Sequence, residues 1–120
     1  LDAYKKLVAH IKEKSPSTRI ILMSNTSSYL PTQLANAEPA KKEGRFYAIF
    51  GIEKHLEDFN ANVKRVADEN KLEYWDVYEP TKSHPEKKSL FLEADGVHLS
   101  VKGNQFIAEK ILACFAGGAK

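Results

Sequence analysis

The sequence predicts an α/β fold in which a parallel sheet lies between two layers of helices. Amphipathic patterns with helical spacing alternate with short continuous apolar runs. Such runs are typical of strands that are buried on both faces. The order helix, strand, helix, strand, helix favours parallel strands joined by right-handed crossovers. The length of 120 residues fits one domain rather than two.

The first half of the chain contains one helix, one strand and one long loop by its pattern. Apolar residues recur at spacings of three and four over residues 1–14, which predicts a helix that ends before Pro16. The run RIILMSN, residues 19–25, is predicted to be the first strand. Residues 26–45 are rich in small polar residues and contain two prolines, so we expect an irregular loop that is functional or mobile.

The second half repeats the alternation and then closes with a helix. We expect a helix over residues 51–70, a strand within KLEYWDVYEP at residues 71–80, and a last helix with Ser100 as its N-cap. The predicted domain portion covers residues 1–116, and residues 117–120 form a tail. Two strands and three helices leave an apolar strand edge unpaired, which favours association with another polypeptide segment.

Composition and charge exclude several classes of protein. A hydrophobic content of 42% with 28% charged residues is that of a soluble globular protein. The net charge of +2 gives no field that would attract nucleic acid or an anionic membrane. Cys114 is the single cysteine, and no run is long enough to span a bilayer. The chain begins without Met in the middle of a helical pattern, so we expect that its natural N-terminus lies elsewhere, and the compartment, cytoplasmic or extracellular, stays open.

Asp95 and His98 form the candidate site. They lie three residues apart in DGVHLSVKGN, after the second strand and before the last helix, and ligands in α/β sheets bind beyond the carboxyl ends of the strands. This spacing allows the carboxylate to hold one imidazole nitrogen while the other faces a cleft. In the alternative interpretation Asp95 caps a turn and His98 is a satisfied, partly buried histidine. A metal site that adds Glu93 is disfavoured because no second histidine is near. We expect His84 to be solvated.

The segment DGVHLSVKGNQFIAEKIL resembles the last sequence block of the SGNH, or GDSL-type, hydrolase family. RIILMSN is similar to the family's fourth strand, and residues 1–14 are similar to the helix before that strand. FNANVKRVADENKLEYWDVYEP is similar to the family's penultimate helix and fifth strand. The segment HLSVKGNQF is most similar to the corresponding segment of esterases of the isoamyl acetate-hydrolysing type. The resemblance covers nearly the whole chain.

This resemblance implies the C-terminal portion of a flavodoxin-like three-layer fold that hydrolyses esters through a serine acyl-enzyme, without metal or cofactor. Asp95 would orient the imidazole, and His98 would be the general base. The family's GDS, glycine and GxND blocks are not in these 120 residues and should precede Leu1. Loop hydrogen bonding is the expected role of Ser24, as it is of Ser27 and Ser28.

The expected substrate is a small ester, of short-acyl or acetyl type, or an acylated carbohydrate. The expected substrate-binding residues follow the first strand: Ser27, Ser28, Tyr29 and Leu30. The expected partner is the N-terminal half of the same domain, or another chain that covers the open strand edge. A second class remains open, a non-catalytic binding module that keeps Asp95 and His98 as relics. A flavodoxin-like nucleotide binder is disfavoured because no glycine-rich phosphate loop is present.

Overall fold

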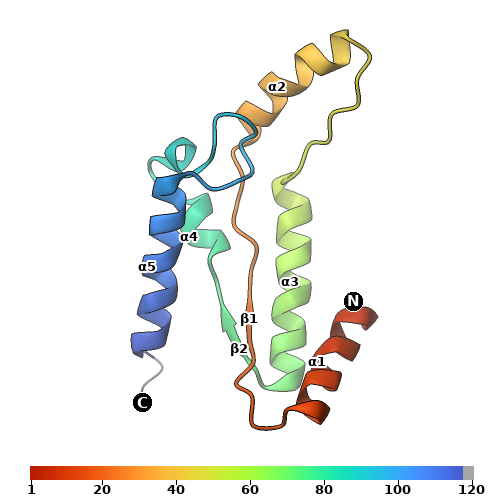
Figure 1. The fold of residues 1–120 in the computed structure, drawn as a ribbon, viewed down its shortest axis with the longest axis vertical. Helices are drawn as coiled ribbons and strands as arrows, with labels where there is room; N and C mark the ends of the chain where they lie inside the picture. Colours follow the sequence, from red (N-terminus) through yellow and green to blue (C-terminus); the bar gives the residue numbers. More distant parts are fainter. Residues whose placement is uncertain (118–120) are drawn as a thin grey trace.

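The order of helices and strands follows the predicted alternation, with three additions. The computed structural model describes residues 1–117 (Figure 1). Its elements are α1 (Asp2–Lys14), β1 (Ile21–Met23), α2 (Leu30–Lys42), α3 (Glu53–Asn70), β2 (Glu73–Trp75), α4 (Tyr78–Lys82), the 3₁₀ helix η1 (Lys87–Leu90) and α5 (Val101–Gly117). The additions are α2, α4 and η1.

The two strands pair in parallel, as predicted. Their register places Leu22 opposite Tyr74 and Met23 opposite Trp75. β2 is shorter than the predicted strand because the carboxylate of Asp76 accepts hydrogen bonds from the backbone N–H groups of Tyr78 and Glu79, at 2.9 and 3.2 Å. These bonds turn the chain from β2 directly into α4.

One face of the sheet is covered by α1 and α3. The buried core on this face consists of Val8, Leu22, Val63, Val66 and Ala67. Val8 comes from α1, Leu22 from β1, and the other three from the repeating apolar positions of α3. Burial of these side chains is what holds both helices on the sheet, since each aliphatic side chain contributes about 1.5–3 kcal/mol when it leaves water.

The opposite face is covered in part by α5 (Figure 1). The rings of Trp75 and Phe115 meet edge to face with centroids 4.7 Å apart. Gly103 lets α5 approach η1 closely, because a Cβ at this position would lie 2.0 Å from the carbonyl oxygen of Leu90. His84, expected to be solvated, is half-buried with its ring 4.8 Å from that of Phe106. Helices on both faces make the three-layer α/β/α arrangement that the sequence predicts.

Residues 28–52, here called the arm, contain a helix where the sequence predicted an irregular loop over residues 26–45. The arm contains α2 and a return segment that leads to α3, and it extends beyond the end of the strands (Figure 1). Pro31 lies in the first turn of α2, where a missing N–H breaks no helical hydrogen bond. Pro39 lies inside the helix, close to its end at Lys42.

Gly117, the first residue of the predicted tail over residues 117–120, is the last residue of α5. The rest of this tail lies outside the described residues. Among residues 1–117, no helix combines the length and the apolar character that crossing a membrane requires.

Candidate active site

Asp95 and His98, here called the dyad, lie in direct contact. The Oδ2 atom of Asp95 is 2.7 Å from Nδ1 of His98. The Oδ1 atom of Asp95 accepts hydrogen bonds from the backbone N–H groups of Val97 and His98, at 2.7 and 2.8 Å. Gly96 permits this tight turn with a positive φ of 69°. The sequence folds locally so that one carboxylate fixes both the turn and the imidazole.

The charge state of Asp95 follows from its surroundings. Burial raises the pKa of Asp95, but hydrogen bonds from Val97 N–H and from the ring and N–H of His98 outweigh burial, so this pKa lies below its ordinary value. An ionised carboxylate only accepts hydrogen bonds, so Nδ1 of His98 carries the proton. The side chain of His98 is 78% exposed, against 31% for Asp95. Among residues 1–117, no group hydrogen-bonds Nε2 of His98, so this atom can exchange a proton with a reactant.

The dyad loop, residues 92–98, is held at its base by backbone hydrogen bonds. The N–H of Leu92 donates to the carbonyl of His98, and the N–H of Gly96 donates to that of Leu92, both at 2.8 Å. Ser100 then starts α5 as predicted, because its Oγ accepts from Gly103 N–H at 3.1 Å. These bonds place the dyad at the entry to α5.

The serines that follow β1 are committed to hydrogen bonds that hold the fold. Ser24 Oγ accepts from the N–H groups of Val77 and Tyr78, at 2.8 and 2.9 Å, and ties the end of β1 to that of β2. Ser27 is 2% exposed, and Ser28 is 5% exposed. The hydroxyl of Ser28 donates to the Gly51 carbonyl at 2.9 Å and accepts from Gln33 Nε2 at 3.1 Å. Among the described residues, no serine hydroxyl hydrogen-bonds His98.

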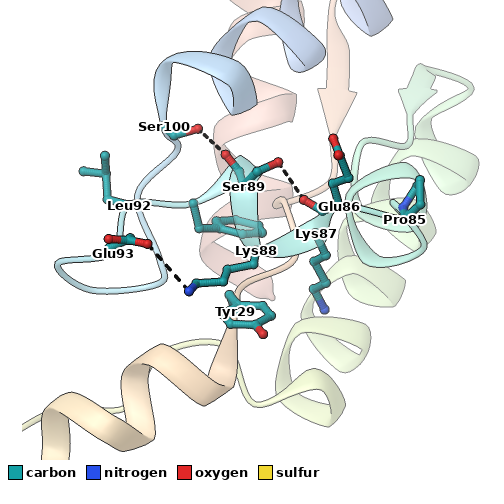
Figure 2. Close-up of a pocket in the computed structure, with 10 residues that line it drawn as sticks. Tyr29, Pro85, Glu86, Lys87, Lys88, Ser89, Leu92, Glu93 and Ser100 are labelled. Carbon is teal, nitrogen blue, oxygen red and sulfur yellow. Dashed lines mark hydrogen bonds and ion pairs between the residues drawn. The ribbon is translucent and has the colours of Figure 1, made fainter.

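A pocket of about 650 Å³ borders the dyad loop (Figure 2). Its lining comes from the start of the arm, from the segment around η1 and from the entry to α5: Tyr29, Pro85, Glu86, Lys87, Lys88, Ser89, Phe91, Leu92, Glu93 and Ser100. The backbone N–H of Tyr29 donates to the Gly96 carbonyl of the dyad loop, and Leu92 and Glu93 belong to that loop. Another pocket, of about 460 Å³, has Ser28, Tyr29 and Leu30 in its lining.

Three residues around this site were not predicted from the sequence. Asn36 donates from Nδ2 to the Ala94 carbonyl at 2.7 Å. Gln33 is buried and connects Ser28 to the N–H of Phe50, which donates to Gln33 Oε1 at 2.7 Å. These contacts join distant segments, so a local pattern gives no signal for them. The third, Gly51, is the first residue of the predicted helix over residues 51–70, and its positive φ of 85° keeps it outside the observed helix.

A half-buried carboxylate in hydrogen-bond contact with an exposed imidazole, at the carboxyl ends of a parallel sheet, is an arrangement that suits acid and base chemistry. Residues 1–106 match the GDSL-like Lipase/Acylhydrolase family, and the chain belongs to this family. No curated protein is significantly similar to the chain.

Two solved structures have a similar fold. The esterase domain of the ZfL2-1 ORF1 protein from the zebrafish ZfL2-1 retrotransposon gives a TM-score of 0.66 at 19% identity, over 97% of this chain and 56% of that chain. The lipase/acylhydrolase from Enterococcus faecalis gives 0.64 at 15% identity, over 95% of this chain and 50% of that chain. The chain therefore spans about half the length of these two structures.

Proposed function

We propose that this chain supplies the acid and base of a Ser-His-Asp ester hydrolase, and that the nucleophilic serine comes from polypeptide outside these 120 residues. One observation carries the proposal. Asp95 fixes Nδ1 of His98 at 2.7 Å, while the exposed Nε2 atom has no partner among residues 1–117. An imidazole held in this way lacks only a nucleophile to activate.

The proposed reaction is acyl transfer to serine and then to water. Nε2 of His98 removes the hydroxyl proton as the serine oxygen attacks the ester carbonyl. Asp95 stabilises the imidazolium that forms, and the imidazolium then protonates the departing alcohol. Water attacks the acyl-enzyme by the same route in the second half of the cycle. No metal or cofactor takes part in this scheme.

The open side of β1 is the proposed position of the polypeptide that carries the serine. In the described part of the chain β1 pairs with β2 alone. Met23 of β1, whose side chain alternates with that of Leu22 and so lies on the α5 face of the sheet, is 42% exposed, and Leu112 of α5 is 66% exposed. A parallel strand with a helix on this face would bury both side chains and pair the free backbone edge. The part of each similar structure that this chain does not cover is long enough to supply both elements.

The pocket of about 650 Å³ beside the dyad loop is the proposed substrate site. Its apolar wall contains Phe91 and Leu92, and its polar wall contains Lys87 and Lys88. Such a lining suits a small ester whose alcohol carries hydroxyl groups, including an acylated carbohydrate. Ser27, Ser28, Tyr29 and Leu30 remain proposed substrate-side residues, and Tyr29 is the one that lines this pocket. The hydroxyls of Ser27 and Ser28 face protein partners.

A non-catalytic binding module is the second candidate. The open edge of β1 favours it, because an unpaired strand can accept a strand from a binding partner. In that case Asp95 and His98 only shape the loop, and no associated serine reacts.

The test is to express the complete coding region that contains this chain and to measure hydrolysis of p-nitrophenyl acetate and of an acetylated sugar. We expect hydrolysis by the complete product, its loss in His98→Ala, and full activity in His10→Ala, since His10 is an exposed residue of α1. Residues 1–120 alone should give only the background rate. A fluorophosphonate label, located by peptide mass spectrometry, should be on a serine outside residues 1–120.

Three outcomes would count against the proposal. Hydrolysis that survives His98→Ala would remove the dyad from the reaction. A labelled serine inside residues 1–120 would place the nucleophile in this chain. A complete product that neither hydrolyses these esters nor takes the label would support the binding module.

A further inference from the structure

The arm contacts the dyad loop at two carbonyl oxygens, one on each side of Asp95. The N–H of Tyr29 donates to the carbonyl of Gly96 at 2.7 Å. The side-chain amide of Asn36 donates to the carbonyl of Ala94, also at 2.7 Å. The peptide group that precedes Asp95 and the one that follows Gly96 are therefore both tied to the arm.

Only one of these two contacts can be removed by substituting a side chain. The contact at Gly96 involves backbone atoms only, and the chain is closely packed there, since a Cβ on Gly96 would lie 2.5 Å from the Tyr29 carbonyl oxygen. The contact at Ala94 depends on a single side chain. Among residues 1–117, Asn36 is the only group that hydrogen-bonds the Ala94 carbonyl.

The arm is a firm anchor because its two ends are joined by buried polar groups. Gln33 is 1% exposed; its Nε2 donates to Ser28 Oγ, and its Oε1 accepts from the N–H of Phe50. Ser28 Oγ in turn donates to the carbonyl of Gly51 at 2.9 Å. A buried network in which each partner is satisfied is rigid. Asn36 lies one turn along α2 from Gln33, on this fixed base.

We infer that Asn36 is a positioning residue that acts through Asp95 on His98. By holding the Ala94 carbonyl, Asn36 keeps the carboxylate of Asp95 aligned with Nδ1 of His98, and so keeps the ring proton on Nδ1. The catalytic consequence rests on the proposed function, whereas the effect on the imidazole belongs to this chain alone. No contact between Asn36 and substrate is required.

The experiment measures the ring tautomer of His98 by ¹⁵N NMR in the chain of residues 1–120, at a pH where the ring is neutral. The wild-type ring should be mainly in the form protonated at Nδ1. Asn36→Ala should lower the ratio of this form to the one protonated at Nε2 by about fivefold, the factor that corresponds to one hydrogen bond of ordinary strength. Ala is a better helix former than Asn, so α2 is not weakened by the substitution.

Two further variants make the result specific. Asn36→Leu keeps most of the volume and removes the donor, so it should repeat the effect of Asn36→Ala. Asn62→Ala is the matched control, because Asn62 is an exposed residue of α3 whose side chain, within residues 1–117, hydrogen-bonds only that of Arg65. This control should leave the His98 tautomer ratio unchanged.

An unchanged His98 tautomer ratio in folded Asn36→Ala and Asn36→Leu would overturn the inference. If both variants unfold, Asn36 is a general structural residue and the inference is also wrong. The outcome is independent of the nucleophile: a shifted ratio together with an inactive complete protein would reject the proposed function and leave the role of Asn36 standing. In an active enzyme, the same variants should lower kcat and leave KM unchanged.

Discussion

Two segments at the same end of the sheet are rich in polar side chains, yet they use them in opposite ways. After β1, Ser24, Ser27 and Ser28 are buried. The hydroxyls of Ser24 and Ser28 contact distant segments of the chain, and that of Ser27 donates to the neighbouring Ser28 carbonyl. In the dyad loop, Asp95 satisfies one side of the imidazole, and the rest of His98 is exposed. A polar residue with all its partners inside the fold stabilises that fold. One with a free reactive atom is available for chemistry.

The two segments should differ most in how a substitution changes kcat. His98→Ala in the complete enzyme should lower kcat by about 10⁴- to 10⁶-fold, because the general base and the later acid are both lost. Steady-state hydrolysis of p-nitrophenyl acetate measures it. Ser24→Ala, which removes a hydroxyl from the other segment, should change stability and not the chemical step. Equal losses of kcat from both substitutions in folded protein would contradict the comparison.

The contact between the two segments is the next target. Gly96→Ala should lower the free energy of unfolding by about 2 kcal/mol, since a Cβ at φ 69° is strained and also meets the Tyr29 carbonyl oxygen at 2.5 Å. Urea unfolding measures this loss. Gly44→Ala is the matched control, with a φ of 67° and no atom within 4 Å of the added Cβ. The two variants should differ by the cost of the contact, so equal losses would mean that the segments are not pressed together.

A smaller effect is expected inside the segment after β1. Ser28→Ala should destabilise the fold by about 1 kcal/mol, because it removes a hydrogen-bond partner from the buried amide of Gln33 and from the Gly51 carbonyl. Ser17→Ala, at an exposed turn before β1, should change stability by less than about 0.5 kcal/mol. Thermal unfolding of both variants provides the measurement. A neutral Ser28→Ala would mean that its hydroxyl is free, as a substrate-binding role requires.

Sequence periodicity predicted the elements whose apolar residues face the core. α1, α3 and the parallel strands follow this rule, and so their positions were recognised. α2 breaks it, because its buried residues are the polar Gln33 and the small Ala40, while Leu34 is exposed. A helix whose inner side is polar has no apolar repeat to detect. The arm was therefore expected to be irregular.

The dyad and its support differ in the same way. Asp95 and His98 lie within one turn of chain, so their spacing alone suggested that they meet. Asn36 reaches Ala94 across 58 positions of the sequence, and nothing near either residue indicates the pairing. Local chemistry is readable from one sequence, whereas contacts that depend on how the arm folds back are not.

The smallest effect concerns acid stability. The pKa of Asp95 is raised by burial but lowered further by its hydrogen bonds, so it lies below the ordinary value. A carboxyl group of this kind stabilises the fold above the unfolded pKa of about 3.9, and this stabilisation disappears as the pH falls through the lower folded value. Asp95→Asn is isosteric and cannot ionise. Its free energy of unfolding should therefore fall less steeply with decreasing pH than that of the wild type, as urea unfolding over the acid range would measure. Asp58→Asn, an exposed position on α3, is the control. An unchanged acid slope in Asp95→Asn would mean that the contacts of Asp95 stabilise the fold equally whether its carboxyl group is ionised or protonated.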